Sequence, residues 1–401
     1  MKILFISAFN LTTNPRISKE LKYAINLNYT CDFIGIDLGG WSAKIDKKII
    51  PSLNARKLTF LPITRKNFFN WLVWAFLEKL ACSLSIIFKN SLWLNALAHS
   101  RRSIILWNFI RKQKQHYDLI IAHTLPSLYP AYKLSKIKKI PFIFDVEDYH
   151  PGEKCSRQEQ QRRKFLMSKL LPYANFITCA SEMICEYTLK LIPNFNKNKT
   201  QTVYNSFAQE EFTLYISQKT NIQFVWFSQN IASNRGLELI LPALYKYKHI
   251  VNLTLIGNLY QDFYNNFLAK YSEILTIKQP MPQTELNKEI CKYDIGLALE
   301  LNQSDFNRSI CLTNKIFAYA QAGLYILATN TPAQERFISQ HPILGITTKQ
   351  NSIEIEKIIK LIINNKDNII KQKPKRFRYA KKLSWDKEKQ KISQIWKSFD
   401  S

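Results

Sequence analysis

The 401-residue chain is 46% hydrophobic and carries a net charge of +27, from 57 Lys and Arg against 30 Asp and Glu. This apolar and aromatic content excludes a disordered chain, and the length suits two domains of ordinary size. The charge favours an anionic partner and leaves three classes open: nucleic acid, a phosphorylated small molecule or an anionic membrane surface.

The first half contains three patterns of buried parallel strands, at residues 2–7, 117–124 and 141–148. Each is a continuous apolar run bounded by polar residues, as expected when helices cover both faces of a sheet. Helical patterns at residues 15–28 and 126–139 follow the first two. The first ten residues lack the features of an export signal. We expect a first α/β domain over residues 1–198.

Residues 65–114 depart from this alternation. They contain nine Lys or Arg, one acidic residue and four tryptophans, namely Trp71, Trp74, Trp93 and Trp107. The mixture favours a pair of helices lying in a membrane interface, with aromatic faces toward lipid and cations toward anionic headgroups. A spanning helix fits less well, because charged residues interrupt the apolar run and a span needs about 20 apolar residues.

Two other interpretations of this segment stay open. A buried helical insert would account for the aromatic residues. The basic excess, however, continues to Lys139 with only Glu78 and Asp118 opposing it, and a core face needs no such excess. Nucleic-acid binding would use the same residue types, but no recognisable nucleic-acid module is present.

A second series of strands alternates with helices, at residues 222–229, 251–257, 293–300 and 324–329. It predicts a second doubly wound sheet over residues 199–380, followed by a closing amphipathic helix at 381–401. Two such domains in tandem would face each other across a cleft at the carboxyl ends of their strands, where ligands of open α/β folds bind.

The seven cysteines are scattered and form neither a Cys-x-x-Cys pair nor a Cys/His spacing suited to zinc. The sequence therefore predicts no metal site. An odd, scattered set favours reduced thiols and a cytosolic compartment.

Cations stand at two expected helix starts in the second half. Arg235 directly precedes Gly236, while Thr313, Asn314 and Lys315 open another helix. A helix N-terminus offers free NH groups to phosphate, and a neighbouring cation adds charge pairing. Together the two starts favour a pyrophosphate clamp, whereas each alone would suit an ordinary solvated surface residue.

The order of these segments resembles the GT-B glycosyltransferases of the large retaining family four, which includes sucrose synthases and bacterial mannosyltransferases. The similarity covers nearly the whole chain. In the first half it rests on "YDLIIAHTLPSLYPAYKLSK", "PFIFDVEDYHPGE" and "ANFITCASEMICEY". In the second half it rests on "VYNSF", "FVWFSQNIASNRGLELI", "LTNKIFAYAQAGLYILAT" and "SWDKEKQKISQIW".

The resemblance implies two Rossmann-like domains, a closing helix that returns to the first domain, and a nucleotide-sugar donor held by the second. Arg235 and Lys315 would stabilise the departing nucleotide diphosphate, with no need for a metal ion or other cofactor. The implied donor site comprises Ser228, Asn230, Arg235, Gly236, Glu300, Thr313, Asn314 and Lys315.

The same resemblance assigns catalytic roles to His123, Arg235 and Lys315, with His123 near the reacting sugar. A hydrogen-bonded histidine at a strand end is the alternative for His123. The implied acceptor side comprises Asn14, Arg16, Asp145, Glu147 and Asp148. Its three acidic residues would either orient an acceptor hydroxyl or cap the following turn.

Several positions depart from the family pattern. Ala318 stands where the family commonly has the second Glu of its Glu-x7-Glu pair, and Gln229 stands where a glycine is common. Glu147 replaces an expected histidine, and "NLTTNPRIS" replaces a glycine-rich loop. Ala318 leaves the ribose contact open, with Glu300 as its remaining candidate. The other departures predict a donor and acceptor geometry different from that of the better-known members.

The sequence thus predicts a cytoplasmic, membrane-peripheral glycosyltransferase that uses a nucleotide sugar and a glycan or lipid-linked acceptor, without nucleic acid. A GT-B sugar-nucleotide epimerase and a non-catalytic protein that binds membrane or anionic polymer are the rival functions.

Overall fold

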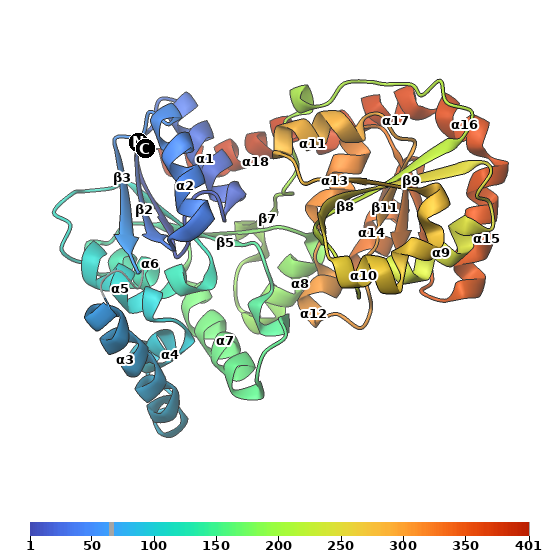
Figure 1. Cartoon of the computed structure of the whole chain (residues 1–401). Helices are drawn as coiled ribbons and strands as arrows, with labels where there is room; N and C mark the ends of the chain where they lie inside the picture. Colours follow the sequence, from blue (N-terminus) through green and yellow to red (C-terminus); the bar gives the residue numbers. More distant parts are fainter. Residues whose placement is uncertain (64–67, 401) are drawn as a thin grey trace. The chain divides into compact units, whose positions relative to one another are not determined.

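The computed structural model describes residues 1–63 and 68–400 and divides the chain into two compact units (Figure 1). Unit 1 comprises Met1–Val203 and Lys389–Ser401, and unit 2 comprises Tyr204–Glu388. Each unit has one parallel sheet with helices on both faces. The predicted pair of doubly wound α/β domains is confirmed.

Unit 1 has a seven-stranded parallel sheet in the order β3-β2-β1-β4-β5-β6-β7. The strand order reverses between β1 and β4, and this reversal creates a switch point at their carboxyl ends. The strands are β1 (Lys2–Ser7), β2 (Thr30–Asp37), β3 (Lys57–Pro62), β4 (Leu119–His123), β5 (Phe142–Val146), β6 (Phe176–Cys179) and β7 (Thr200–Thr202).

The helices of unit 1 are α1 (Pro15–Asn26), α2 (Gly40–Ile49), α3 (Phe68–Ile87), α4 (Leu92–His99), α5 (Arg101–Ile110), α6 (Leu125–Lys138), α7 (Arg157–Leu170) and α8 (Glu182–Leu191). Helix α1 shows how the sequence fixes such an element. Pro15 occupies its first position, and the Asn14 side chain accepts a hydrogen bond from the Ile17 NH at 3.3 Å. Both features are typical of helix starts.

The chain returns to unit 1 at its end, as the resemblance implied. Helix α18 (Trp385–Lys397) brings Trp396, which is 1% exposed, against Phe5, Tyr23 and Tyr29. The Met1 amino group lies 3.5 Å from Asp400, so the two termini are adjacent (Figure 1). The closing helix therefore completes the core of unit 1.

Unit 2 has a six-stranded parallel sheet in the order β10-β9-β8-β11-β12-β13, with its switch point between β8 and β11. The strands are β8 (Ile222–Ile231), β9 (Val251–Leu259), β10 (Leu275–Lys278), β11 (Ile295–Ala298), β12 (Tyr325–Thr329) and β13 (Gly345–Thr348). The helices are α9 (Leu237–Tyr245), α10 (Gln261–Asn266), α11 (Gln283–Ile290), α12 (Phe306–Ile310), α13 (Asn314–Gln321), α14 (Pro332–Gln340), α15 (Ser352–Asn364), α16 (Lys366–Lys371) and α17 (Lys373–Ala380).

The basic, aromatic segment forms three helices instead of the expected pair. Residues 65–67 of this segment lie outside the described residues, and the rest folds into α3, α4 and α5. Helices α4 and α5 bury one face each in unit 1, and Trp107 is only 8% exposed. Helix α3 packs on α4 and α5 and is the least buried of the three, with only Ala81 and Ser85 buried.

Candidate functional site

The carboxyl edge of the unit 1 sheet carries a row of polar residues. Strand pairing places Ser7, His123, Asp145 and Thr178 side by side across β1, β4, β5 and β6. All four are at most 5% exposed. The predicted residues His123 and Asp145 therefore meet at the switch point of this sheet.

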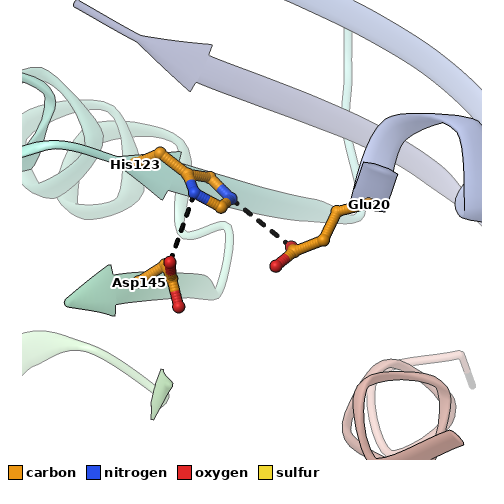
Figure 2. Close-up of side chains that lie close together, drawn as sticks. All are labelled: Glu20, His123 and Asp145. Atoms are coloured by element: carbon orange, nitrogen blue, oxygen red, sulfur yellow. Dashed lines mark ion pairs between the residues drawn. The ribbon is translucent and has the colours of Figure 1, made fainter. Parts of the chain in front are cut away.

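His123 has an acidic side chain on each of its ring nitrogens (Figure 2). Its Nε2 lies 3.4 Å from Glu20 Oε2, and its Nδ1 lies 3.4 Å from Asp145 Oδ2 and 3.0 Å from Glu147 Oε1. The His123 side chain is fully buried. A hydrogen-bonded histidine at a strand end is what the geometry shows, and its predicted catalytic role stays a prediction.

Arg16 closes the other side of this cluster. Its Nε and Nη2 lie 2.7 Å from the two carboxylate oxygens of Asp145, and its Nε lies 3.7 Å from Glu20. Its Nη1 donates to the Val203 carbonyl at 2.5 Å. The guanidinium is 1% exposed, so Arg16, predicted on the acceptor side, is enclosed by protein groups.

The charges of this cluster shift one another's pKa values. Burial lowers the pKa of His123, but the Glu20 charge and hydrogen bonds with Asp145, Glu147 and Glu20 outweigh it, so this pKa lies well above its usual value. Burial raises the pKa of Asp145, but Arg16, His123 and Thr178 hold it below its usual value. Two cations therefore face the carboxylates of Glu20, Asp145 and Glu147.

Glu20, His123 and Asp145 also place one ligand atom each within 4.8 Å of the others, which is compatible with a bound cation by residue type. The Arg16 guanidinium already lies 2.7 Å from Asp145. The raised pKa of His123 favours an imidazolium, which cannot ligate a metal. The arrangement fits an ion-pair cluster better than a metal site.

The remaining acceptor-side residues take different positions. Asn14 is 2% exposed and its side chain caps α1. Glu147 is partly exposed beside His123, and Asp148 follows it in the loop after β5. Sequence reasoning missed Glu20. Its spacing of four residues from Arg16 on one helix was the available signal, because such residues share a face.

In unit 2, Glu300 and Lys315 meet near the carboxyl ends of β11 and β12. Lys315 Nζ lies 3.4 Å from Glu300 Oε1, and Arg308 Nη1 lies 3.8 Å from Glu300 Oε2. The Glu300 backbone is fixed by Thr329, whose Oγ1 accepts from the Glu300 NH at 2.8 Å. The carboxylate of Glu300 is therefore paired with two cations. One of them, Arg308 on α12, was not predicted from the sequence.

Arg235 stands at the start of α9 and makes no hydrogen bond or ion pair with another described residue. The next residue, Gly236, has φ +88°, and a Cβ there would approach Leu299 Cβ to 2.8 Å. A glycine is therefore required where α9 begins against the end of β11. A cavity of about 370 Å³ adjoins this helix start, with Asn234, Gly236, Glu238, Leu239, Leu301, Asn302, Gln303 and Gln350 in its wall.

The other predicted donor residues lie on β8 and α13. Ser228 and Asn230 belong to an irregular part of β8, between Phe227 and Asn230, where the register with β9 shifts. Thr313 and Asn314 begin α13. Ala318 is fully buried in the core. The structure brings Glu300 and Lys315 together, but shows no contact of either with Arg235.

Helix α3 forms a second unusual surface, on unit 1 alone. Only Ala81 and Ser85 of its 20 residues are buried. One face of the helix is apolar and exposed, and its members are Phe69, Leu72, Val73, Phe76, Leu80 and Ile87. Among the described residues, α3 is the one helix long and apolar enough to cross a membrane by length and composition.

The opposite face of α3 is bonded to its own domain. Glu78 accepts a hydrogen bond from the Arg101 NH at 3.0 Å, Cys82 Sγ donates to the Ala98 carbonyl at 3.4 Å, and Arg162 donates to Ser85 Oγ at 3.1 Å. These bonds hold α3 along the side of unit 1, where Figure 1 shows it beside α4.

Comparisons with known proteins agree with this architecture. No protein-family model matches the sequence, and no curated protein matches it. Among solved structures, HepE from Anabaena in complex with UDP superposes with a TM-score of 0.69 at 14% identity, covering 99% of this chain and 100% of HepE.

Two further structures extend the comparison. A glycosyltransferase from Rickettsia africae has a TM-score of 0.64 at 14% identity, covering 99% of this chain and 98% of its own. A UDP-N-acetylglucosamine 2-epimerase has a TM-score of 0.55 at 9% identity, with coverage of 93% and 90%. The chain has the GT-B fold, with two Rossmann-like domains and a closing helix that returns to the first.

Proposed function

We propose that the chain is a GT-B glycosyltransferase that moves a sugar from a nucleotide diphosphate donor to a hydroxyl of a glycan or lipid-linked acceptor. The observation that carries this proposal is the excess of cations at the carboxyl edge of unit 2. Lys315 and Arg308 share the single carboxylate of Glu300, and Arg235 has no described partner. An anionic ligand at this edge would complete the charge balance.

The donor class follows from the same edge. A diphosphate offers two adjacent anionic groups, which suits Arg235 and Lys315 at the starts of two helices. Such cations stabilise a departing diphosphate without a metal ion. Support comes from HepE, a protein of the same fold solved with UDP and with UDP-glucose. Transfer of a hexose with retention in cell-surface polysaccharide assembly completes the proposal.

The donor is tested with a panel of UDP-, GDP- and ADP-sugars, measured by calorimetric binding and by product analysis. We expect Arg235→Ala and Lys315→Ala each to weaken donor binding about tenfold or more, because each removes a charge-assisted hydrogen bond. Lys246→Ala, which removes an exposed cation paired with Glu356 in the same unit, is the control. Unchanged donor binding in both variants would exclude the clamp.

A GT-B sugar-nucleotide epimerase is the second candidate, supported by the fold shared with UDP-N-acetylglucosamine 2-epimerase. An epimerase changes the sugar of the donor in the absence of any acceptor. Chromatography of the sugar products therefore separates the two activities. Donor binding without turnover would favour the non-catalytic alternative.

The location proposed for the enzyme is the inner face of the cell membrane, in contact with the cytoplasm. The support is the exposed apolar face of α3, since contiguous exposed apolar surface marks interaction sites. Lys79 and Lys89 are exposed on α3 and just after it, and the only acidic residue of the helix, Glu78, is bonded to Arg101. An anionic surface suits such a helix lying in its plane.

Vesicle flotation tests this location. We expect wild-type protein to float with anionic vesicles, and the triple change Phe69→Ser, Phe76→Ser and Leu80→Ser to reduce binding about tenfold or more, because apolar burial drives insertion. Ile353→Ser is the control, because it removes from unit 2 an apolar side chain that is as exposed as Phe69. Wild-type protein that ignores anionic vesicles would exclude the membrane location.

A further inference from the structure

A cavity of about 650 Å³ lies in unit 1 between α2, the ends of β2 and β3, and α3. Its wall contains Asp37, Gly39, Gly40, Ala43, Lys44, Lys47, Pro62, Ile63, Asn70, Trp71, Trp74 and Ile105. The ion-pair cluster around His123 contributes none of these residues. The cavity is therefore separate from that cluster, and none of the predicted site residues lines it.

The wall combines two kinds of side chain. Lys44 and Lys47 are three residues apart on α2, so they share a face of that helix. Both are exposed, and neither makes a hydrogen bond or ion pair with another described residue. Trp71 and Trp74 are three residues apart on α3 and are partly buried against the domain. Cations and indole rings thus face one space.

Asp37 is the one carboxylate among the described residues of this wall. Its Oδ1 accepts a hydrogen bond from the Gly39 NH at 2.7 Å, so this oxygen is committed to the loop that begins α2. Arg101 lies over the Trp71 ring, with its guanidinium carbon 5.2 Å from the ring centroid. The Arg101 guanidinium is paired with Glu78 at 3.7 Å. The positive charge of the described wall therefore comes from Lys44 and Lys47, against the one carboxylate of Asp37.

We propose that this cavity binds the phosphate group of a lipid-borne acceptor, with Lys44 and Lys47 pairing the phosphate and Trp71 and Trp74 contacting the adjoining apolar or sugar part. The membrane, not the aqueous phase, is the source of this ligand, because α3 forms one wall of the cavity and carries the exposed apolar face on its other side. The inference rests on the proposed glycosyltransferase function and names its acceptor class.

The test uses flotation of the full chain with three kinds of vesicle: neutral phosphatidylcholine, the same lipid with a small fraction of polyprenyl phosphate, and the same lipid with phosphatidylglycerol of equal total charge. We expect the protein to bind vesicles with polyprenyl phosphate about tenfold more tightly than vesicles with phosphatidylglycerol. Because the surface charge is equal in both, a difference in binding would come from recognition of the polyprenyl phosphate itself. Inorganic phosphate at the same concentration should not displace the protein. Displacement by inorganic phosphate would show a site for free phosphate and overturn the proposal.

Two pairs of variants test whether the preference for polyprenyl phosphate arises in the cavity. The double change Lys44→Gln and Lys47→Gln should remove the tenfold preference for polyprenyl phosphate. The double change Lys79→Gln and Lys89→Gln should weaken binding to both kinds of anionic vesicle but leave that preference unchanged. Ala43→Phe should fill the cavity and lose the preference. Ile45→Phe changes an exposed residue of the same helix and should keep the preference for polyprenyl phosphate. A preference retained in Ala43→Phe, or lost equally in both lysine pairs, would overturn the proposal.

This experiment can fail separately from the proposed function. Arg235→Ala and Lys315→Ala lie in unit 2 and should leave vesicle binding unchanged. Wild-type protein that turns over a nucleotide sugar but shows no preference for polyprenyl phosphate would refute the cavity assignment and leave the transferase intact. Preference without turnover of any donor would refute the transferase alone.

Discussion

The two sheets of this protein end in polar edges of opposite character. At the edge of unit 1, Arg16 and His123 are enclosed by Glu20, Asp145 and Glu147, and the cluster is almost fully buried. At the edge of unit 2, Lys315 and Arg308 share Glu300 at distances of 3.4 and 3.8 Å. At the first edge, the cations are paired with carboxylates of the protein. At the second edge, the cations outnumber the carboxylate that they share, so positive charge is available for a ligand.

This difference shows that a charged residue at a strand end is not by itself a ligand-binding residue. Burying an ion pair costs desolvation free energy, which only close partners offset, so the unit 1 cluster depends on all of its members. A partly exposed cation costs little and can exchange its partner for a phosphate oxygen. The two edges are therefore expected to respond differently to substitution.

The largest expected effect is on stability, from Asp145→Asn. This change leaves Arg16 and His123 without their shared carboxylate in a buried site, which costs about 3–5 kcal/mol of unfolding free energy. Chemical denaturation, followed by near-ultraviolet circular dichroism, measures it. Glu356→Gln, which breaks the exposed pair with Lys246 in unit 2, is the control and should leave the midpoint unchanged. Equal midpoints for wild type and Asp145→Asn would contradict the comparison.

A smaller effect should appear as pH dependence. The pKa of His123 is raised in the folded state, so its stabilisation is complete below the ordinary histidine value and is lost as pH rises through the folded value. The pKa of Asp145 is lowered, so its stabilisation is lost as pH falls below the ordinary aspartate value. Wild-type stability minus that of His123→Gln should therefore decrease from pH 6 to pH 9, by at most about 1.4 kcal/mol per pH unit.

Thermal unfolding of both proteins at a series of pH values gives this difference directly. Taking the difference between the two proteins removes the titration of groups outside the cluster. A difference that stays constant between pH 6 and pH 9 would mean that folding does not raise the pKa of His123.

The smallest expected effect is a gain in ligand binding, from Glu300→Gln. Removing the carboxylate frees Lys315 and Arg308 for a diphosphate, so affinity for a nucleoside diphosphate should rise about threefold to tenfold. The matched change Glu238→Gln alters a carboxylate at the start of α9, whose Oε1 accepts from the Asn234 NH at 2.7 Å, and tests whether any nearby acid has this effect. Weaker diphosphate binding in Glu300→Gln would mean that Glu300 itself contacts the ligand.

Much of the fold could be predicted from the sequence. The apolar runs at residues 2–7 and 251–257 became β1 and β9, because a continuous run bounded by polar residues suits a strand covered on both faces. The resemblance to GT-B proteins also identified Glu300 and Lys315, which the structure places in contact. Local patterns sufficed here because each signal lies within one element.

Other features could not be predicted because they depend on partners distant in sequence. Asp145 is 129 positions from Arg16, and no local pattern assigns Arg16 to Asp145 instead of to a substrate. The cavity between α2 and α3 likewise needs both helices in place. The basic segment had one composition throughout, yet α5 is buried and α3 is exposed.

Backbone propensity and apolar periodicity act over a few neighbouring residues, so the elements, their order and the residue types at the strand ends follow from local sequence. Which charges are neutralised and which stay available follows from the three-dimensional fold. That outcome depends on burial and on the distance between side chains from separate strands and helices, and folding alone brings them together.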